Sequence, residues 1–135
     1  MRVLVDTPIW SLALRRRSRT ADDPATAELA SLIRDSRAAL IGAVRQELLS
    51  GIREQPHFER VREHLRAFPD IEITREDYEQ AASFFNLCRT KGIQGSNTDF
   101  LICAIAARGD FSIFTTDVDF THFAQILPIT LHPVA

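Results

Sequence analysis

The feature that most constrains the fold of this chain is a short apolar run, near its start, that ends at an acid. Residues 3–5 are Val-Leu-Val, and Asp6, Thr7 and Pro8 follow. An unbroken apolar run predicts a strand buried on both faces, as in a parallel sheet. Proline fits the first turn of a helix, where its missing N–H costs nothing, so a helix is expected from Thr7 or Pro8. Asp6 is therefore expected at the C-terminal end of a central strand, where open α/β sheets bind ligands.

The size and composition of the chain are those of one soluble globular domain. It has 135 residues, of which 45% are hydrophobic and 25% charged, so we expect a single domain over residues 1–135. No apolar run approaches the roughly 20 residues that cross a bilayer, and the N-terminus lacks a secretory pattern. We therefore expect a cytoplasmic protein with no membrane contact. A formal net charge of −2 argues against a generic nucleic-acid binder but permits a local basic surface.

Cysteine and histidine usage excludes two common kinds of site. Cys88 and Cys103 both fall within apolar helical patterns, so buried free thiols are expected rather than a disulfide framework. The four histidines show neither zinc-finger nor HExxH spacing. A histidine-based zinc site is therefore not expected.

Apolar periodicity predicts strands that alternate with helices along the whole chain. Strands are expected at residues 2–5, 38–41, 71–73, 111–115 and 129–131. Helices are expected at residues 7–14, 24–36, 42–52, 55–68, 75–89 and 98–107, with a short one ending at residue 125. The alternation predicts an α/β fold with a mostly parallel sheet of four or five strands.

Capping residues mark several of these helix ends. Asp23 precedes Pro24 as a cap does, and Thr74 with Asp77 resembles a capping box. Ser96 or Asn97 is expected to cap the helix over 98–107, and Gly109 to close it. That helix is apolar nearly all round, which predicts burial.

Several acidic residues lie next to apolar strands or on apolar helices, where an acid is not needed to keep the protein soluble. Asp6 and Asp117 follow apolar strands, Asp99 lies in the first turn of the most apolar helix, and Glu47 lies among apolar helical positions. Asp119 is a fifth, less certain candidate. Taken singly, the aspartates could be helix caps or turn residues, and Glu47 could pair with an arginine.

Taken together, these acids predict a metal site. Acids that follow parallel strands, or lie on helices packed against the same sheet, can converge on one end of that sheet. Converging carboxylates repel one another unless a positive charge lies between them. Ligation by oxygen alone favours Mg²⁺ or Mn²⁺ over zinc, and such ions promote hydrolysis of phosphodiester bonds. The chemistry implied is metal-dependent cleavage of a nucleic-acid backbone.

The chain resembles a PIN-domain ribonuclease, most closely a VapC-type toxin of a toxin–antitoxin pair. The matching segments occur in the family's order and span nearly the whole chain. They are residues 3–10 (VLVDTPIW), 45–51 (RQELLSG), 95–104 (GSNTDFLICA) and 114–120 (FTTDVDF). The resemblance implies a PIN-like three-layer α/β/α sandwich with a four- to five-stranded sheet.

The resemblance also implies roles for individual residues. Asp6, Glu47, Asp99 and Asp117 would be the catalytic and metal-binding acids, joined less certainly by Asp119 as a supporting or capping residue. The hydroxyl groups that could orient water or a carboxylate belong to Thr7, Ser96 and Thr116. The departure from the family is Pro8, where a small hydroxyl residue is common, so no side-chain bond is expected from that position.

The family's partners follow by the same resemblance. It implies an RNA substrate, a homodimer, and inhibition by a small cognate antitoxin protein. An arginine-rich stretch at residues 15–19 follows the helix that leaves the site. Arg15, Arg16 and Arg17 are therefore candidates for guiding the RNA backbone, since phosphate contacts position a nucleic acid without reading its sequence. A solvated loop or a contact with the antitoxin explains them equally well.

Two other functions remain open from the sequence. One is a PIN-fold nuclease that processes RNA or cuts DNA without an antitoxin. The other is a non-catalytic binding module in which the acids serve only as caps and ion-pair partners. A phosphatase that forms an aspartyl phosphate is disfavoured, because the chain lacks a second aspartate two residues after Asp6.

Overall fold

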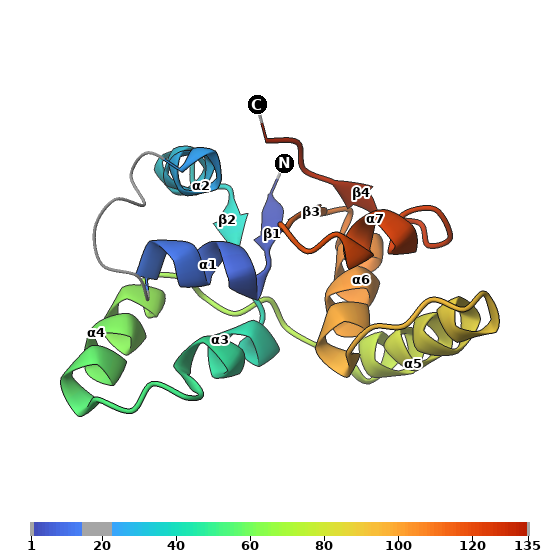
Figure 1. Ribbon diagram of the computed structural model, residues 1–135, viewed down its shortest axis with the longest axis horizontal. Coiled ribbons are helices and arrows are strands. Elements are labelled where there is room, and N and C mark those ends of the chain that lie inside the picture. The colour runs from blue at the N-terminus through green and yellow to red at the C-terminus, as the bar shows by residue number, and fades with distance from the viewer. Residues whose placement is uncertain (1, 15–22, 135) are drawn as a thin grey trace.

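The computed structural model describes residues 2–14 and 23–134, and within them it contains four strands and seven helices (Figure 1). The strands are β1 (Val3–Val5), β2 (Ala38–Ala39), β3 (Ser112–Phe114) and β4 (Thr130–Leu131). The helices are α1 (Thr7–Leu14), α2 (Pro24–Arg34), α3 (Gly42–Leu49), α4 (Gln55–Leu65), α5 (Arg75–Thr90), α6 (Asn97–Gly109) and α7 (Asp119–Phe123). The predicted alternation of strands and helices is confirmed.

The strands form one parallel sheet in the order β2-β1-β3-β4. β1 lies inside it, with Val3 beside Ala38 on one neighbour and beside Ser112 on the other. All three residues of β1 are buried, as the apolar run predicted. Helices α1 and α2 lie on one side of the sheet and α5 and α6 on the other, which gives three α/β/α layers (Figure 1).

The prediction of a fifth strand at residues 71–73 is wrong. The structure has only an isolated parallel bridge between Leu40 and Asp70, in which the Ile71 N–H donates to the Leu40 carbonyl at 3.0 Å. Its would-be partner β2 contains only two residues, so there is little edge on which pairing could extend. The segment then turns directly into the N-cap of α5 at Thr74.

Several helices end one to three residues from the predicted positions, and α3 and α4 differ most. α3 and α4 stop at Leu49 and Leu65, three residues before the predicted ends in each case. α6 runs on to Gly109, and the left-handed residue that closes it is Asp110, with φ of 57°. Gly109 has a different purpose, because a Cβ there would lie 2.2 Å from the Phe111 ring. The glycine permits this close approach rather than the reversal of the chain.

The predicted helix caps are confirmed. The Asp23 carboxylate accepts from the Ala25 N–H at 2.8 Å, with Pro24 at the first helical position. Thr74 and Asp77 form a capping box at the start of α5. Ser96, rather than Asn97, caps α6.

The core is built around α6. Its residues 100–106 are all buried, as its uniformly apolar sequence predicted. Cys88 and Cys103 are buried free thiols, which confirms the expectation. Within the described residues, no helix has both the length and the apolar character needed to span a membrane.

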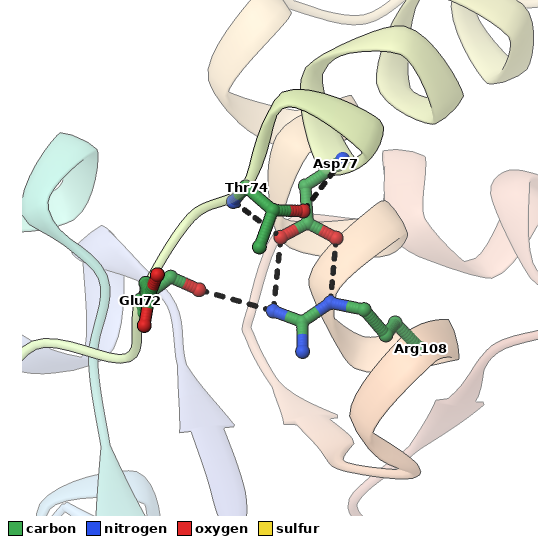
Figure 2. A network of polar contacts seen from close by, with 4 residues as sticks. All are labelled: Glu72, Thr74, Asp77 and Arg108. Carbon is green, nitrogen blue, oxygen red and sulfur yellow. Dashed lines mark hydrogen bonds and ion pairs between the residues drawn. The ribbon is translucent and has the colours of Figure 1, made fainter.

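An ion pair between buried Asp77 and exposed Arg108 joins α5 to α6 (Figure 2). Asp77 is 2% exposed and accepts two hydrogen bonds from the Arg108 guanidinium, at 2.7 and 2.9 Å. Thr74 donates its N–H to the same carboxylate, and Arg108 also reaches the Glu72 carbonyl at 3.0 Å. Burial raises the pKa of Asp77, but the hydrogen bonds from Arg108 and Thr74 outweigh it and hold the pKa below its ordinary value.

We predict that Asp77→Ala lowers the free energy of unfolding by about 2–4 kcal/mol. The change leaves the guanidinium of Arg108 unpaired and removes half of the capping box. Glu76→Ala is the matched control, since Glu76 is an exposed acid in the same helical turn, and it should lose less than about 1 kcal/mol. Urea unfolding at neutral pH measures both, and equal losses would contradict the account.

Candidate active site

Asp6 is a buried carboxylate at the C-terminal end of β1. It is 4% exposed, and both of its oxygens are hydrogen-bonded. Oδ1 accepts from the Thr7 N–H at 2.8 Å, and Oδ2 accepts from the Thr115 hydroxyl at 2.8 Å. Asp6 thus binds the first residue of α1 and also reaches across to the neighbouring strand. Each oxygen keeps a lone pair for a further partner.

The hydroxyl that supports Asp6 belongs to Thr115, which the sequence analysis did not single out. Thr115 follows β3, and β3 pairs with β1 so that Phe114 lies beside Val5. The Thr115 hydroxyl also accepts from the Asp117 N–H at 3.0 Å, so it joins two of the acids. Thr116, the predicted hydroxyl, is exposed and has no hydrogen bond to any described residue. The signal that could have identified Thr115 is the parallel pairing of β1 with β3, because Thr115 follows Phe114 just as Asp6 follows its partner Val5.

Glu47 reaches the site from α3 by way of Thr7. The Thr7 hydroxyl donates to Glu47 Oε1 at 2.7 Å, which ties the start of α1 to α3. The prediction that Glu47 lies among the apolar positions of its helix rather than on the opposite face is wrong. α3 buries Val44 and Leu48, and Glu47, between them in sequence, is exposed.

Asp99 is fixed by the cap of α6. Its Oδ2 accepts from the Ser96 N–H at 3.0 Å, while its own N–H donates to the Ser96 hydroxyl at 3.1 Å. The carboxylate is thereby held at the N-terminus of the helix, where the helix dipole favours negative charge. Ser96 thus holds the Asp99 carboxylate through its backbone N–H, while its hydroxyl caps the helix by accepting from the Asp99 N–H.

Asp117 and Asp119 follow β3 but differ in their surroundings. Asp117 Oδ1 accepts from the N–H of Asp119, two residues further along the chain, at 2.9 Å. Asp119 is the first residue of α7, and its carboxylate has no hydrogen bond or ion pair to a described residue. Asp117 therefore joins the site through Thr115, whereas Asp119 contributes a backbone N–H.

The electrostatics show that four of the acids lie close together. The pKa of Asp6 is raised from 3.8 to about 6, chiefly by burial; the hydrogen bonds from Thr115 and Thr7 oppose the rise, and the charges of Asp99 and Asp117 add to it. Burial likewise raises the pKa of Asp99, with added contributions from Asp117 and Glu47. Among the described residues, none of the four acids is in an ion pair with an arginine, lysine or histidine. The site is a concentration of negative charge that lacks a cationic partner from this part of the chain.

The donor set suits a hard divalent cation that keeps part of its water shell. In residues 2–14 and 23–134, no three acidic, histidine or cysteine side chains are grouped closely enough to hold one ion by themselves. Mg²⁺ commonly binds through one or two carboxylates and several waters, so this spacing fits it. The buried, hydrogen-bonded Asp6 and the helix-capped Asp99 are the rigid members that would hold such an ion. The predicted RNA guides Arg15, Arg16 and Arg17 lie outside the described residues.

The acidic site lies at the carboxyl edge of the parallel sheet and is shared among two strands and two helices: Asp6 and Asp117 follow β1 and β3, and Glu47 and Asp99 lie on α3 and α6. The family model described as "PIN domain" matches residues 3–126. This chain therefore belongs to the PIN-domain family, and membership implies a nuclease. Proteins of this family generally use divalent metal ions. A search of curated proteins found no matching relative.

Solved structures support the same fold. The chain is similar to a chain in the complex of VapBC2 from Rickettsia felis with a fragment of promoter DNA, at 18% identity and a TM-score of 0.77 over 98% of both chains. It is also similar to a chain of FitAcB from Neisseria gonorrhoeae, at 21% identity and a TM-score of 0.68, covering 97% of this chain and 96% of that one. A toxin–antitoxin complex from Klebsiella pneumoniae matches at 21% identity and a TM-score of 0.69 over 97% of both chains. At these identities the likeness establishes the fold alone.

We predict that Asp6→Asn stabilises the fold at neutral pH. The unfolded chain releases this proton near pH 3.8 and the folded chain holds it to about pH 6, so ionisation of Asp6 lowers stability as pH rises between those values. Asparagine removes the charge, its oxygen can still accept from the Thr7 N–H, and its amide can donate to the Thr115 hydroxyl in place of the bond that Asp6 accepts. It should therefore raise the free energy of unfolding by about 1–3 kcal/mol above about pH 7, with little difference near about pH 4.

Urea unfolding in EDTA at both pH values measures this effect. Asp110→Asn, which changes an exposed acid in a left-handed position that asparagine tolerates, is the control. A loss of stability at neutral pH in Asp6→Asn would show that the ionised carboxylate is favourable in this site, contrary to the account.

Proposed function

We propose that this protein is a divalent-metal-dependent endoribonuclease, the toxin of a toxin–antitoxin pair. The observation that carries the proposal is the set of four acids, Asp6, Glu47, Asp99 and Asp117, gathered at the carboxyl edge of β1 and β3 with no ion pair to a cationic side chain of the described residues. Membership of the PIN family supports a nuclease. The structural neighbours from Rickettsia felis, Neisseria gonorrhoeae and Klebsiella pneumoniae support the toxin assignment, since the last is described as a toxin–antitoxin complex.

Each acid has a distinct part in the proposed reaction. Asp6 and Asp99 are held most firmly, by Thr7 with Thr115 and by Ser96, and they bind the ion. Mg²⁺ or Mn²⁺, when bound, supplies a more acidic water and neutralises phosphate charge. Glu47 is exposed and held by the Thr7 hydroxyl, so it can orient a water or accept its proton.

Asp117 completes the proposed site as a supporting acid. Its N–H bonds the Thr115 hydroxyl, which in turn donates to Asp6, so movement of one acid is transmitted to the other. Asp119 supplies a backbone N–H to Asp117 and stays outside the proposed ligand set. The protein would act in the cytoplasm as a homodimer, on RNA, under the control of an antitoxin that covers this acidic edge.

Expression of the protein in a bacterial host should arrest growth, and Asp99→Asn should abolish the arrest. The matched control is Asp110→Asn, which changes an exposed acid beyond the opposite end of the same helix and should arrest growth as the wild type does. Co-expression of the protein encoded by the adjacent gene should restore growth. Arrest by Asp99→Asn at full strength would refute the site, and growth with every variant would refute the toxin assignment.

The purified proteins provide the biochemical arm of the same test. The wild type should cleave single-stranded RNA with Mg²⁺ or Mn²⁺, and EDTA should stop the reaction. Asp99→Asn should lower the rate by at least about a hundredfold, because it removes a ligand charge from the reacting centre. Cleavage of DNA in place of RNA would favour a DNA-directed nuclease, and binding without cleavage of either would favour a non-catalytic module.

A further inference from the structure

A small aromatic pocket lies beside the acidic site. It has a volume of about 180 Å³ and lies between the C-terminal half of α5 and the segment that leads into α6. We refer to it as the aromatic pocket, and its lining residues are Phe85, Arg89, Ile93, Gln94, Gly95 and Phe100. None of these residues takes part in the hydrogen bonds that position the four acids.

The aromatic pocket and the acidic site share one stretch of backbone. Gly95 lines the pocket, and the next residue, Ser96, donates its N–H to Asp99. Phe100 lines the pocket and directly follows Asp99 in α6. The pocket and the acidic site are thus built on neighbouring residues of the same segment.

Glycine is required where the shared backbone passes the floor of the pocket. A Cβ at position 95 would lie 2.5 Å from Phe123 and 3.1 Å from the Phe100 ring. Phe100 in turn packs against Phe123 at 4.9 Å and meets Phe85 edge-on at 5.5 Å between ring centroids. The floor is thus a fixed aromatic cluster, and the half-buried Phe85 is its accessible member.

The rim of the pocket carries positive charge and an amide. Arg89 and Gln94 are exposed, and Lys91 lies between them in sequence and is also exposed. Neither Arg89 nor Lys91 has a side-chain hydrogen bond or an ion pair to a described residue. Their charge is therefore available to an anion that approaches the pocket from the acidic site.

We propose that the aromatic pocket binds the base of a nucleotide adjacent to the cleaved phosphodiester bond, and that Arg89 contacts a phosphate of the same strand. This inference rests on the proposed ribonuclease function and adds a binding subsite to it. Single-stranded RNA is recognised through unpaired bases that stack on aromatic or arginine side chains. The volume is below the roughly 300–1,000 Å³ of sites for larger organic ligands, which suits a single base.

The test combines a change in the protein with a change in the RNA. Wild-type protein first defines the cleaved bond in a short single-stranded RNA, and an abasic nucleotide then replaces each flanking position in turn. Phe85→Leu removes the aromatic face but keeps an apolar side chain that packs against the core. At one flanking position, both the abasic nucleotide and Phe85→Leu should raise KM about tenfold, with kcat changed much less.

The combination distinguishes a shared contact from two separate effects. If the base occupies the pocket, Phe85→Leu acting on the abasic RNA should raise KM no more than either change does alone. Arg89→Gln should raise KM and reduce its dependence on salt, whereas Arg75→Gln, at the opposite end of α5, should do neither.

The outcomes separate failure of the subsite from failure of the proposed function. In one outcome, the wild type cleaves RNA while the increases in KM from Phe85→Leu and from the abasic nucleotide multiply at every position. That result overturns the subsite but leaves the proposed ribonuclease function intact. Absence of RNA cleavage by the wild type overturns both. A difference in stability between the wild type and Phe85→Leu, seen as unequal urea midpoints, does not affect the result. For each protein, KM for the intact RNA is compared with KM for the abasic RNA.

Discussion

The structure depends on keeping a carboxylate buried where a central strand ends. Asp6 is 4% exposed and follows β1, whose residues are all buried. Its carboxylate holds the start of α1 through the Thr7 N–H and the end of β3 through the Thr115 hydroxyl. These bonds satisfy the oxygens, but no cationic side chain within residues 2–14 and 23–134 pairs with the charge, and burial raises the pKa of Asp6 to about 6. The fold therefore tolerates an unfavourable charge at the position where a cation would make it favourable, which is characteristic of a functional site.

Helix α6 connects this charge to the rest of the molecule. Its N-terminus holds Asp99 by the Ser96 cap, its middle forms the core, and its C-terminal turn is tied to α5 by Arg108 and Asp77. The two ends of the helix thus meet acids in opposite situations: Asp99 lies in its first turn, and Asp77 of α5 pairs with Arg108 in its last turn. Asp77 is paired with an arginine and its pKa is lowered, whereas the pKa of Asp99 is raised by burial and by neighbouring acids. The paired acid is structural, and the unpaired acid belongs to the proposed catalytic centre.

The sequence alone was sufficient to predict the features that residues close together in the chain determine. The caps at Asp23, Thr74 and Ser96, the buried run before Asp6 and the wholly apolar α6 follow from residue type and spacing, and all were predicted. The failures are tertiary. Residues 71–73 look like a strand, but their partner edge is too short to pair with, and Glu47 looks buried until α3 is placed on the sheet. The role of Thr115 beside Asp6 can be recognised only once the register of β1 and β3 is known. The aromatic pocket likewise depends on tertiary structure, because its residues come from α5, α6 and the segment between them.

The measurement that most directly tests this account is calorimetric titration of the wild type and Asp6→Asn with Mn²⁺ at about pH 6, in buffers of different ionisation enthalpy. Because Asp6 is close to half protonated at that pH, binding of the ion should release a fraction of a proton, and the heat should depend on the buffer. The account predicts saturable binding with proton release in the wild type, and weaker binding without that release in Asp6→Asn. Equal binding by the two proteins, or no binding by the wild type, would contradict it.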